Sequence, residues 1–357
     1  MQNLNLSNRM LVGFLLLTAQ TLGNAQSPIN SDEQWAAINL QVTDELVIPA
    51  YQNLAESAQL LRDVTVNFCE VPDEDSLLAA RQAFNASMDN WQTIQHIQFG
   101  PVTYFNWNFR MQYWPDERGT ANRQFTALLA AENEDILSAD NFARQSVGVQ
   151  GLPTLERLLY EETALADFQS TPYSCRLAVT VANNILEIST GVTERWTDEY
   201  RAVVMDPVSG GVYENSQDLS IEFLRALQEA LAKIRDLKLS PVVGESLDSL
   251  RVRSAESWRS ERSLRNIQLN LAALETLFMS YSLAFQETDV NAVLSAFSQM
   301  QETLTELPAS FAAISQDAVL YAQLQELFEQ ADTLHEALES AIKNTELYLG
   351  FNSLDGD

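Results

Sequence analysis

The sequence has few groups that could hold a transition metal or attack a substrate. Its 357 residues include two histidines and two cysteines, whereas a zinc site typically needs at least three protein ligands. His96 lacks a carboxylate at ligand spacing, and His335 shares only Glu339, in a charged stretch that we expect to be exposed. A His-Glu-x-x-His motif, a nucleophile elbow, a phosphate loop and a dinucleotide fingerprint are also missing. The residues alone therefore identify no catalytic centre.

Positive charge is scarce as well. The chain has 21 Lys and Arg against 49 Asp and Glu residues, a net charge of −28. This balance argues against nucleic acid or an anionic membrane surface as a partner, and it suits a soluble exported protein. Lys233, Lys238 and Lys343 are the only lysines, so most basic residues are arginines. Arginine forms fixed, bidentate contacts with carboxylates, so we expect some arginines to be structural or site residues.

Residues 1–25 predict a signal peptide cleaved after Ala25. Arg9 provides a small positive region, residues 10–17 an apolar region, and Gly23-Asn24-Ala25 a cleavage site of small residues. The apolar run is shorter than the roughly 20 residues that span a bilayer. No later segment is apolar enough to do so. We therefore expect a periplasmic protein that does not span the membrane.

The rest of the chain predicts an all-α fold. Apolar residues recur at spacings of three and four, glycine is sparse, and no run alternates as a strand would. Long helices with one apolar stripe must pack as bundles. The helices are expected at residues 34–61, 76–98, 122–132, 139–147, 171–200, 219–237, 255–285 and 316–349, with one more that ends at Pro308. Asp206-Pro207 and Gly210-Gly211 predict a boundary between two helical-bundle domains, residues 26–206 and 207–357.

Two segments stand out from this helical background. Residues 104–114 combine aromatic side chains with Asn, Arg and Gln, which is typical either of a cleft lining or of an ordered loop packed on a bundle. Residues 148–160 lead from two glycines into a helix. Pro153 suits its first turn, and Glu156 is expected in that turn, near the positive end of the helix dipole. A plain loop-to-helix junction would explain the same residues.

The two cysteines leave two interpretations open. In an exported chain Cys69 and Cys175 favour a disulfide that closes a loop of roughly 100 residues. A pair of buried free thiols is the alternative.

The segment at residues 151–156 resembles the Gly-x-His-x-x-Glu motif of the imelysin family. Gly151 and Glu156 are kept, but Pro153 stands where the family has histidine, a variant similar to the iron-regulated-protein-A-like branch. Further stretches share the resemblance: Trp91-Gln92 with Phe99-Gly100-Pro101, Trp114-Pro115-Asp116, Arg123-Gln124, Tyr173-x-Cys175, residues 258–267, and Gly350-Phe351-Asn352.

The resemblance implies two helical bundles from a duplicated unit, a site near their interface and a link to bacterial iron uptake. A weak similarity between the leucines of residues 152–158 and 271–277 agrees with duplication. The family label is metallopeptidase, but Pro153 removes one metal ligand outright. We therefore favour a non-enzymatic binding or accessory protein over a degenerate metallopeptidase. A structural or partner-docking protein is the third interpretation.

The resemblance places the ligand, an iron complex, a small anion or a peptide, between the two domains. Arginines there would hold carboxylates, and an uptake component of the outer or inner membrane would be the protein partner. The expected ligand contacts are Arg110, Trp114, Asp116, Arg123, Gln150, Gly151, Pro153, Glu156, Arg262 and Asn266. No cofactor is certain, but Glu156 and Asp116 would hold iron or another divalent cation through oxygen. Alternatively, the arginines pair with Glu156, Asp116 or Glu261 and lock the domains together.

Overall fold

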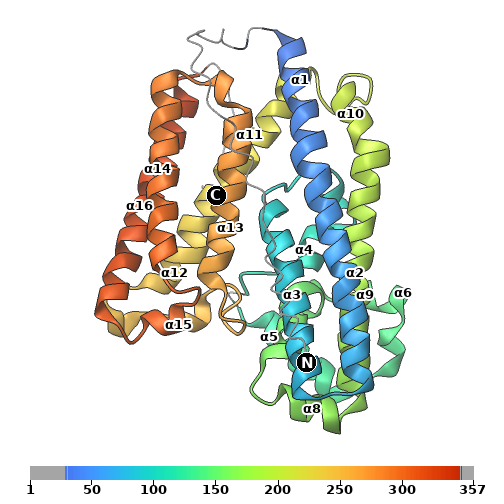
Figure 1. Ribbon diagram of the computed structural model, residues 1–357. Helices are drawn as coiled ribbons and strands as arrows, with labels where there is room; N and C mark the ends of the chain where they lie inside the picture. Colours follow the sequence, from blue (N-terminus) through green and yellow to red (C-terminus); the bar gives the residue numbers. More distant parts are fainter. Residues whose placement is uncertain (1–28, 30, 117, 346, 348–357) are drawn as a thin grey trace, which may run out of the picture.

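The computed structural model describes residues 29, 31–116, 118–345 and 347 (Figure 1). Within these residues the chain forms helices and no β-strand, so the predicted all-α class is confirmed. None of the described helices is long and apolar enough to cross a membrane. The predicted signal peptide and the Gly350-Phe351-Asn352 stretch lie outside the described residues.

The first group of helices is built on three long antiparallel segments. α1 (Asp32–Val42) passes through the π-helical turn η1 (Thr43–Val47) into α2 (Ile48–Glu70), and α3 (Glu74–Ile94) returns along it. α9 (Pro172–Arg195) packs on the other side of α2 and continues through η5 (Trp196–Tyr200) into α10 (Arg201–Met205). Short elements fill the chain between α3 and α9: η2 (Gly100–Asn106), α4 (Trp107–Met111), α5 (Thr120–Ala131), η3 (Glu134–Leu137), α6 (Ala139–Phe142), η4 (Val147–Val149), α7 (Gly151–Tyr160) and α8 (Ala164–Ser170).

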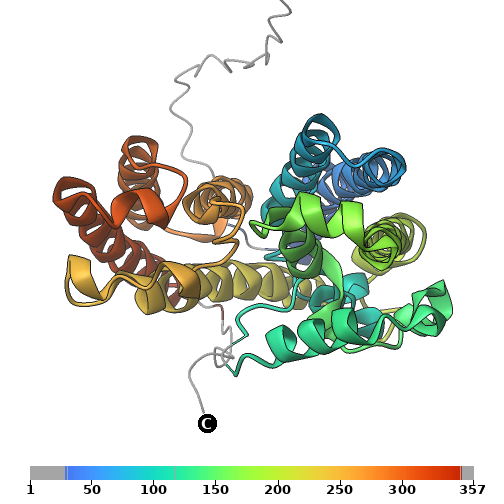
Figure 2. The ribbon, with the colours of Figure 1, turned by 90° about the horizontal axis from the view of Figure 1, so that it is seen from below.

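The second group follows residue 206. α11 (Ser216–Lys233) continues through η6 (Ile234–Leu239) into α12 (Ser240–Val243), and α14 (Glu287–Glu306) packs against α16 (Ala318–Lys343). The remaining elements are η7 (Leu247–Ser249), η8 (Val252–Ser254), α13 (Ser263–Ser280), η9 (Ser282–Ala284) and α15 (Phe311–Ile314). The two groups lie side by side in both views of the ribbon (Figure 1, Figure 2).

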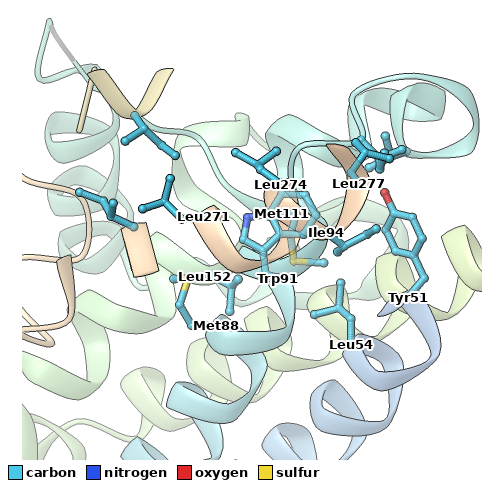
Figure 3. Packing of buried hydrophobic residues seen from close by; sticks show 14 of the residues in the cluster. Tyr51, Leu54, Met88, Trp91, Ile94, Met111, Leu152, Leu271, Leu274 and Leu277 are labelled. Atoms are coloured by element: carbon cyan, nitrogen blue, oxygen red, sulfur yellow. The ribbon is translucent and has the colours of Figure 1, made fainter. Parts of the chain in front are cut away.

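The hydrophobic core runs through both groups without a break. α11 contacts α1, and α13 contacts α3. Figure 3 shows Leu271 and Leu274 of α13 beside Trp91 of α3, and the three side chains belong to one buried cluster. Two groups that share a core are compatible with two domains. The boundary at residues 206–207 and the duplication remain predictions.

Local sequence explains several helix ends. Asp73 and Ser76 form a capping box at the start of α3. Pro172 begins α9, one residue after the predicted start at residue 171, and the Thr171 side chain makes no capping hydrogen bond there. A disulfide joins Cys69 near the end of α2 to Cys175 in the first turn of α9, with the Cα atoms 5.4 Å apart. The predicted disulfide is therefore confirmed.

Candidate functional site

The start of α7 is fixed by close contact with the backbone of α4. Gly151 has φ +69°, and a Cβ atom there would lie 2.2 Å from the carbonyl oxygen of Met111 and 2.3 Å from that of Arg110. Glycine is thus needed both for its backbone conformation and for space. The helix begins at Gly151, so Glu156 lies in its second turn and the expectation of a first-turn acid near the dipole is wrong.

Glu156 is held instead by the second helix group. Its Oε1 accepts hydrogen bonds from the backbone N–H of Ser260 at 2.9 Å and from the Ser260 hydroxyl at 2.7 Å. The side chain is buried, and burial raises the pKa of its carboxyl group, as does the nearby charge of Glu256. The Ser260 donors and Arg259 act in the opposite direction. Glu156 therefore ties α7 to the loop before α13.

A cavity of about 550 Å³ lies beside Glu156. α7 contributes Pro153, Glu156 and Arg157 to its wall, and the segment after α4 contributes Tyr113, Trp114 and Asp116. The loop between η8 and α13 contributes Trp258 and Arg259, and η8 itself Arg253. Because three arginines line this space, we call it the arginine cavity. Its walls come from both helix groups.

The three arginines stack on aromatic rings more than they pair with acids. Arg157 lies over Phe125 with 5.4 Å to the ring centroid, and Arg259 lies over Trp258 at 4.3 Å. Arg253 contacts the same Trp258 ring at 5.4 Å. Arg259 also pairs with Glu161 at 2.7 Å. Burial, followed by the charge of Arg259, lowers the pKa of the Arg157 guanidinium.

Two of these guanidinium groups keep unused donors. Among the described residues, Arg157 and Arg253 have no partner in a hydrogen bond or ion pair, although Asp116, Glu156 and Glu161 lie close enough to Arg157 to influence its charge. Planar donors of this kind match the geometry of a carboxylate. The arrangement can therefore hold an anion with more than one carboxylate group.

Four predicted ligand contacts line the arginine cavity: Trp114, Asp116, Pro153 and Glu156. Both carboxylate oxygens of Asp116 are already used, since they accept from the backbone N–H groups of Thr120 and Asn122 at 2.7 and 3.1 Å. Gly151 lies behind the cavity wall, at the contact with α4. Ligand binding by these residues remains a prediction.

Three other predicted contacts lie elsewhere in the first helix group. Arg110 is buried and donates to Gln150 at 2.9 Å and to Asn184 at 2.7 Å, so Arg110 and Gln150 join α4 to α9. Arg123 donates to the carbonyl oxygen of Arg118 and to the Thr120 hydroxyl. None of the three lines the arginine cavity.

Arg262 and Asn266 connect the two groups from inside the interface. Arg262 donates to Asn85 at 2.9 Å, to Asp89 and to Asn266. It therefore locks the groups together, as one sequence interpretation proposed, but its acidic partner is Asp89 and none of the three acids considered. Arg262 and Asn266, at the start of α13, point into the interface between the two helix groups. Trp258 and Arg259 precede this helix and line the arginine cavity.

The expected ligand contacts did not include the lining residues Arg157, Arg253, Trp258 and Arg259, whereas Tyr113 belongs to the segment 104–114 that was interpreted as either a cleft lining or an ordered loop. Two signals were present, because Arg157 follows Glu156 directly and Arg259 lies in the stretch that resembles the family. Arg253 had no signal, since only the fold brings η8 to α7.

The fold and the site define a class: all-helical proteins whose helix groups meet at a cavity beside a Gly-x-x-x-x-Glu helix start. The imelysin family model matches residues 47–347. The chain therefore belongs to the imelysin family, and the resemblance read from its motifs is confirmed.

Solved structures and a curated relative agree with this assignment. An imelysin-like protein from Psychrobacter arcticum 273-4 superposes with a TM-score of 0.73 at 21% identity, covering 91% of this chain and 99% of that one. A chain provisionally named iron-regulated protein A precursor, from Parabacteroides distasonis ATCC 8503, gives 0.67 at 13% identity, with 87% and 96% covered. "Iron-regulated protein A" of Synechococcus elongatus is 23% identical over 235 residues. That match covers 64% of this chain and 59% of the relative.

The donor set does not fit the metal centre of a peptidase. Such a centre needs typically three protein ligands and an activated water. Pro153 occupies the place of the family histidine, and Glu156 Oε1 is bound by Ser260. The described residues contain no group of three or more His, Cys, Asp or Glu side chains that could hold a metal ion. The predicted cation site of Glu156 and Asp116 remains a prediction.

Proposed function

We propose that this chain is an exported, non-enzymatic binding protein of bacterial iron uptake, which takes a ferric carboxylate chelate into the arginine cavity. The observation that carries the proposal is the presence of Arg157 and Arg253, without acid partners among the described residues, on one cavity of about 550 Å³. This volume lies within the range of small-molecule sites. The iron-related names of two relatives supply the link to iron.

The arginines would bind the carboxylates of the chelate, and no side chain would need to coordinate iron directly. Trp114 and Trp258 provide flat apolar walls beside the guanidinium groups. Arg259, fixed by Glu161 and stacked on Trp258, would keep that wall in place. In a chain with a net charge of −28, the three arginines provide a local positive charge that would hold an anion in the cavity.

Calorimetry on residues 26–357 tests the proposal. The titrants are ferric citrate, citrate alone, ferrous iron and zinc, and the variants are Arg157→Gln, Arg253→Gln and Glu156→Ala. Arg176→Gln is the matched control, because Arg176 is exposed, pairs with Glu134 and does not line the arginine cavity. We expect ferric citrate to bind, and each of Arg157→Gln and Arg253→Gln to weaken binding by about tenfold.

Two outcomes would contradict the proposal. Binding of bare iron or zinc that disappears in Glu156→Ala would indicate a metal site and make a peptidase assay worthwhile. No binding of any titrant would favour a structural or partner-docking protein.

A further inference from the structure

A second cavity, of about 200 Å³, lies next to the arginine cavity and shares Trp114 and Leu237 with it. Two of the three lysines of the chain, Lys233 at the end of α11 and Lys238 in η6, line its wall. We call it the lysine cavity. The function proposed above does not use it.

The two lysines differ in how their charges are balanced. Lys238 is buried and donates to Glu256 at 2.7 Å, to Asn270 at 2.6 Å and to Gln92 at 3.0 Å. Lys233 makes no hydrogen bond or ion pair with any residue the structure describes. Burial lowers the pKa of the Lys233 ammonium group. Glu229, one helical turn earlier, acts in the opposite direction but lies beyond ion-pair distance.

The cavity therefore carries one positive charge more than its acids neutralise. The charge of Glu256 neutralises that of Lys238. Burial lowers the pKa of the Lys238 ammonium group, and repulsion from the charge of Lys233 lowers it further. A single negative charge placed between the ammonium groups would remove this repulsion. The charge balance thus favours a monoanion over a polycarboxylate.

Besides the two lysines, half of the lining residues are apolar and half are polar. The polar ones are Gln95, His96, Gln98, Asn108, Gln112 and Asn270. Trp91, Phe109, Trp114 and Leu274 line the lysine cavity, and Figure 3 shows Trp91 and Leu274 beside each other. Phe109 is 52% exposed, so it stands where the cavity meets solvent. An apolar cavity of about 150 Å³ is large enough for benzene. A volume of about 200 Å³ therefore suits a single ring with one carboxylate.

We propose that the lysine cavity binds a small aromatic monocarboxylate, with the ring between Trp91, Phe109 and Leu274 and the carboxylate at Lys233. This site is separate from the binding of a ferric chelate in the arginine cavity. Its occupant would contact Trp114 and Leu237 from the side opposite to a ligand that fills the arginine cavity, since both cavities share these residues.

Benzoate is the probe, with benzamide as the neutral molecule of the same shape, and calorimetry on residues 26–357 is the measurement. We expect one benzoate per chain and at least tenfold weaker binding of benzamide. Lys233→Gln should weaken benzoate binding by about tenfold, and Phe109→Ala, at a half-exposed position that folding tolerates, should weaken it severalfold. Lys343→Gln is the matched control, because Lys343 is exposed, pairs with Glu339 and lies outside the cavity.

Three results would overturn the proposal. They are no saturable binding of benzoate, equal binding by the wild type and Lys233→Gln, or equal affinity for benzoate and benzamide. If Arg157→Gln lost benzoate binding and Lys233→Gln did not, benzoate would bind in the arginine cavity, and the proposal for the lysine cavity would be wrong. The ferric citrate titrations use different variants, so either proposal can fail without the other.

Discussion

Gly151 is a position where the backbone geometry requires glycine. A side chain there would overlap the carbonyl oxygens of Met111 and Arg110, which are backbone atoms and cannot rotate away. We expect Gly151→Ala to lower the free energy of unfolding by about 3 kcal/mol or more, because the strain of a positive φ adds to this overlap. Urea denaturation followed by circular dichroism measures the loss.

Gly211→Ala provides the control for backbone strain alone. Gly211 has φ +65°, similar to Gly151, but, apart from its chain neighbours, none of the described residues has an atom within 4 Å of the position that a Cβ atom would take there. We expect a cost of about 1 kcal/mol for this change. Equal costs at the two positions would show that the contact between α7 and α4 adds nothing to stability.

His96 predicts a pH dependence of stability. Burial lowers the pKa of its imidazole from 6.5 to about 4. Between pH 6.5 and pH 4, His96 therefore binds a proton in the unfolded chain but not in the folded chain. The free energy of unfolding falls as the pH decreases through this window. The difference amounts to about 2 kcal/mol between pH 7 and pH 5.

His96→Gln should remove this contribution. The measurement is the urea midpoint of the wild type and of the variant at pH 7 and pH 5. Both proteins contain His335 and the same carboxyl groups, so the contributions of these groups cancel in the comparison. We expect the wild type to lose about 2 kcal/mol more than the variant on acidification. An equal loss in both proteins would mean that His96 is accessible to protons in the folded state.

The sequence predicts some site residues better than others, and the reason is helix phase. Trp114, Asp116 and Glu156 reach the arginine cavity because their motifs fix the local chain direction. Arg262 was expected there but turns inward to Asp89. His335 was expected on an exposed face and is instead 8% exposed. A residue with charged neighbours in the sequence is predicted to be exposed to solvent. In a helix, however, a single residue of such a turn can still face the core.

At the scale of elements, the long helices were predictable from periodicity and from their ends. The predicted helices at residues 76–98 and 171–200 begin within about two residues of the observed starts of α3 at Glu74 and α9 at Pro172. The segment from residue 100 to residue 160 was harder, because distant partners hold its short helices in place. Arg81 of α3, for example, donates to the carbonyl oxygen of Leu159 at 2.8 Å. Contacts of this kind leave no local periodic pattern.

The disulfide is the covalent link between two of these elements. It joins α2 to α9 and closes a loop of 106 residues in sequence separation. Closing such a loop restricts the unfolded chain, which corresponds to a stabilisation of up to about 4.7 kcal/mol. We expect the double variant Cys69→Ala/Cys175→Ala to lower the free energy of unfolding by about 2–4 kcal/mol, as measured by urea denaturation.

Reduction provides the control for this variant. A reducing agent should lower the stability of the wild type by a similar amount and leave the double variant unchanged. If the reductant destabilises both proteins equally, the effect does not come from the disulfide.

For the whole molecule, the decisive feature is a buried polar network between the two helix groups. Gln112 donates to Glu256 at 2.7 Å, and Lys238 donates both to Glu256 and to Gln92 of α3. Asn270 of α13 also donates to Gln92, at 3.0 Å to its side-chain oxygen. Nothing in the sequence pairs these positions, because Gln92 and Gln112 lie far along the chain from their partners in the second group and none of them forms a motif.

The network predicts strong coupling between Lys238 and Glu256. Burial alone would raise the pKa of the Glu256 carboxyl group, but Lys238 and the amide donors lower it overall, so the pair is ionised in the folded protein. Removing one partner leaves an uncompensated buried charge, which costs about 3–5 kcal/mol. We expect this loss for Glu256→Gln and for Lys238→Met, measured as free energies of unfolding in urea.

The double variant Glu256→Gln/Lys238→Met should be far less unstable than the sum of the two single changes. It leaves no isolated charge in the interface, and replacing a buried ion pair by neutral groups is often close to neutral in stability. A coupling of at least about 2 kcal/mol in this cycle is the expected result. Additive effects would mean that water reaches the pair, and that the two helix groups are held by the shared hydrophobic core and by Arg262 with Asp89 instead.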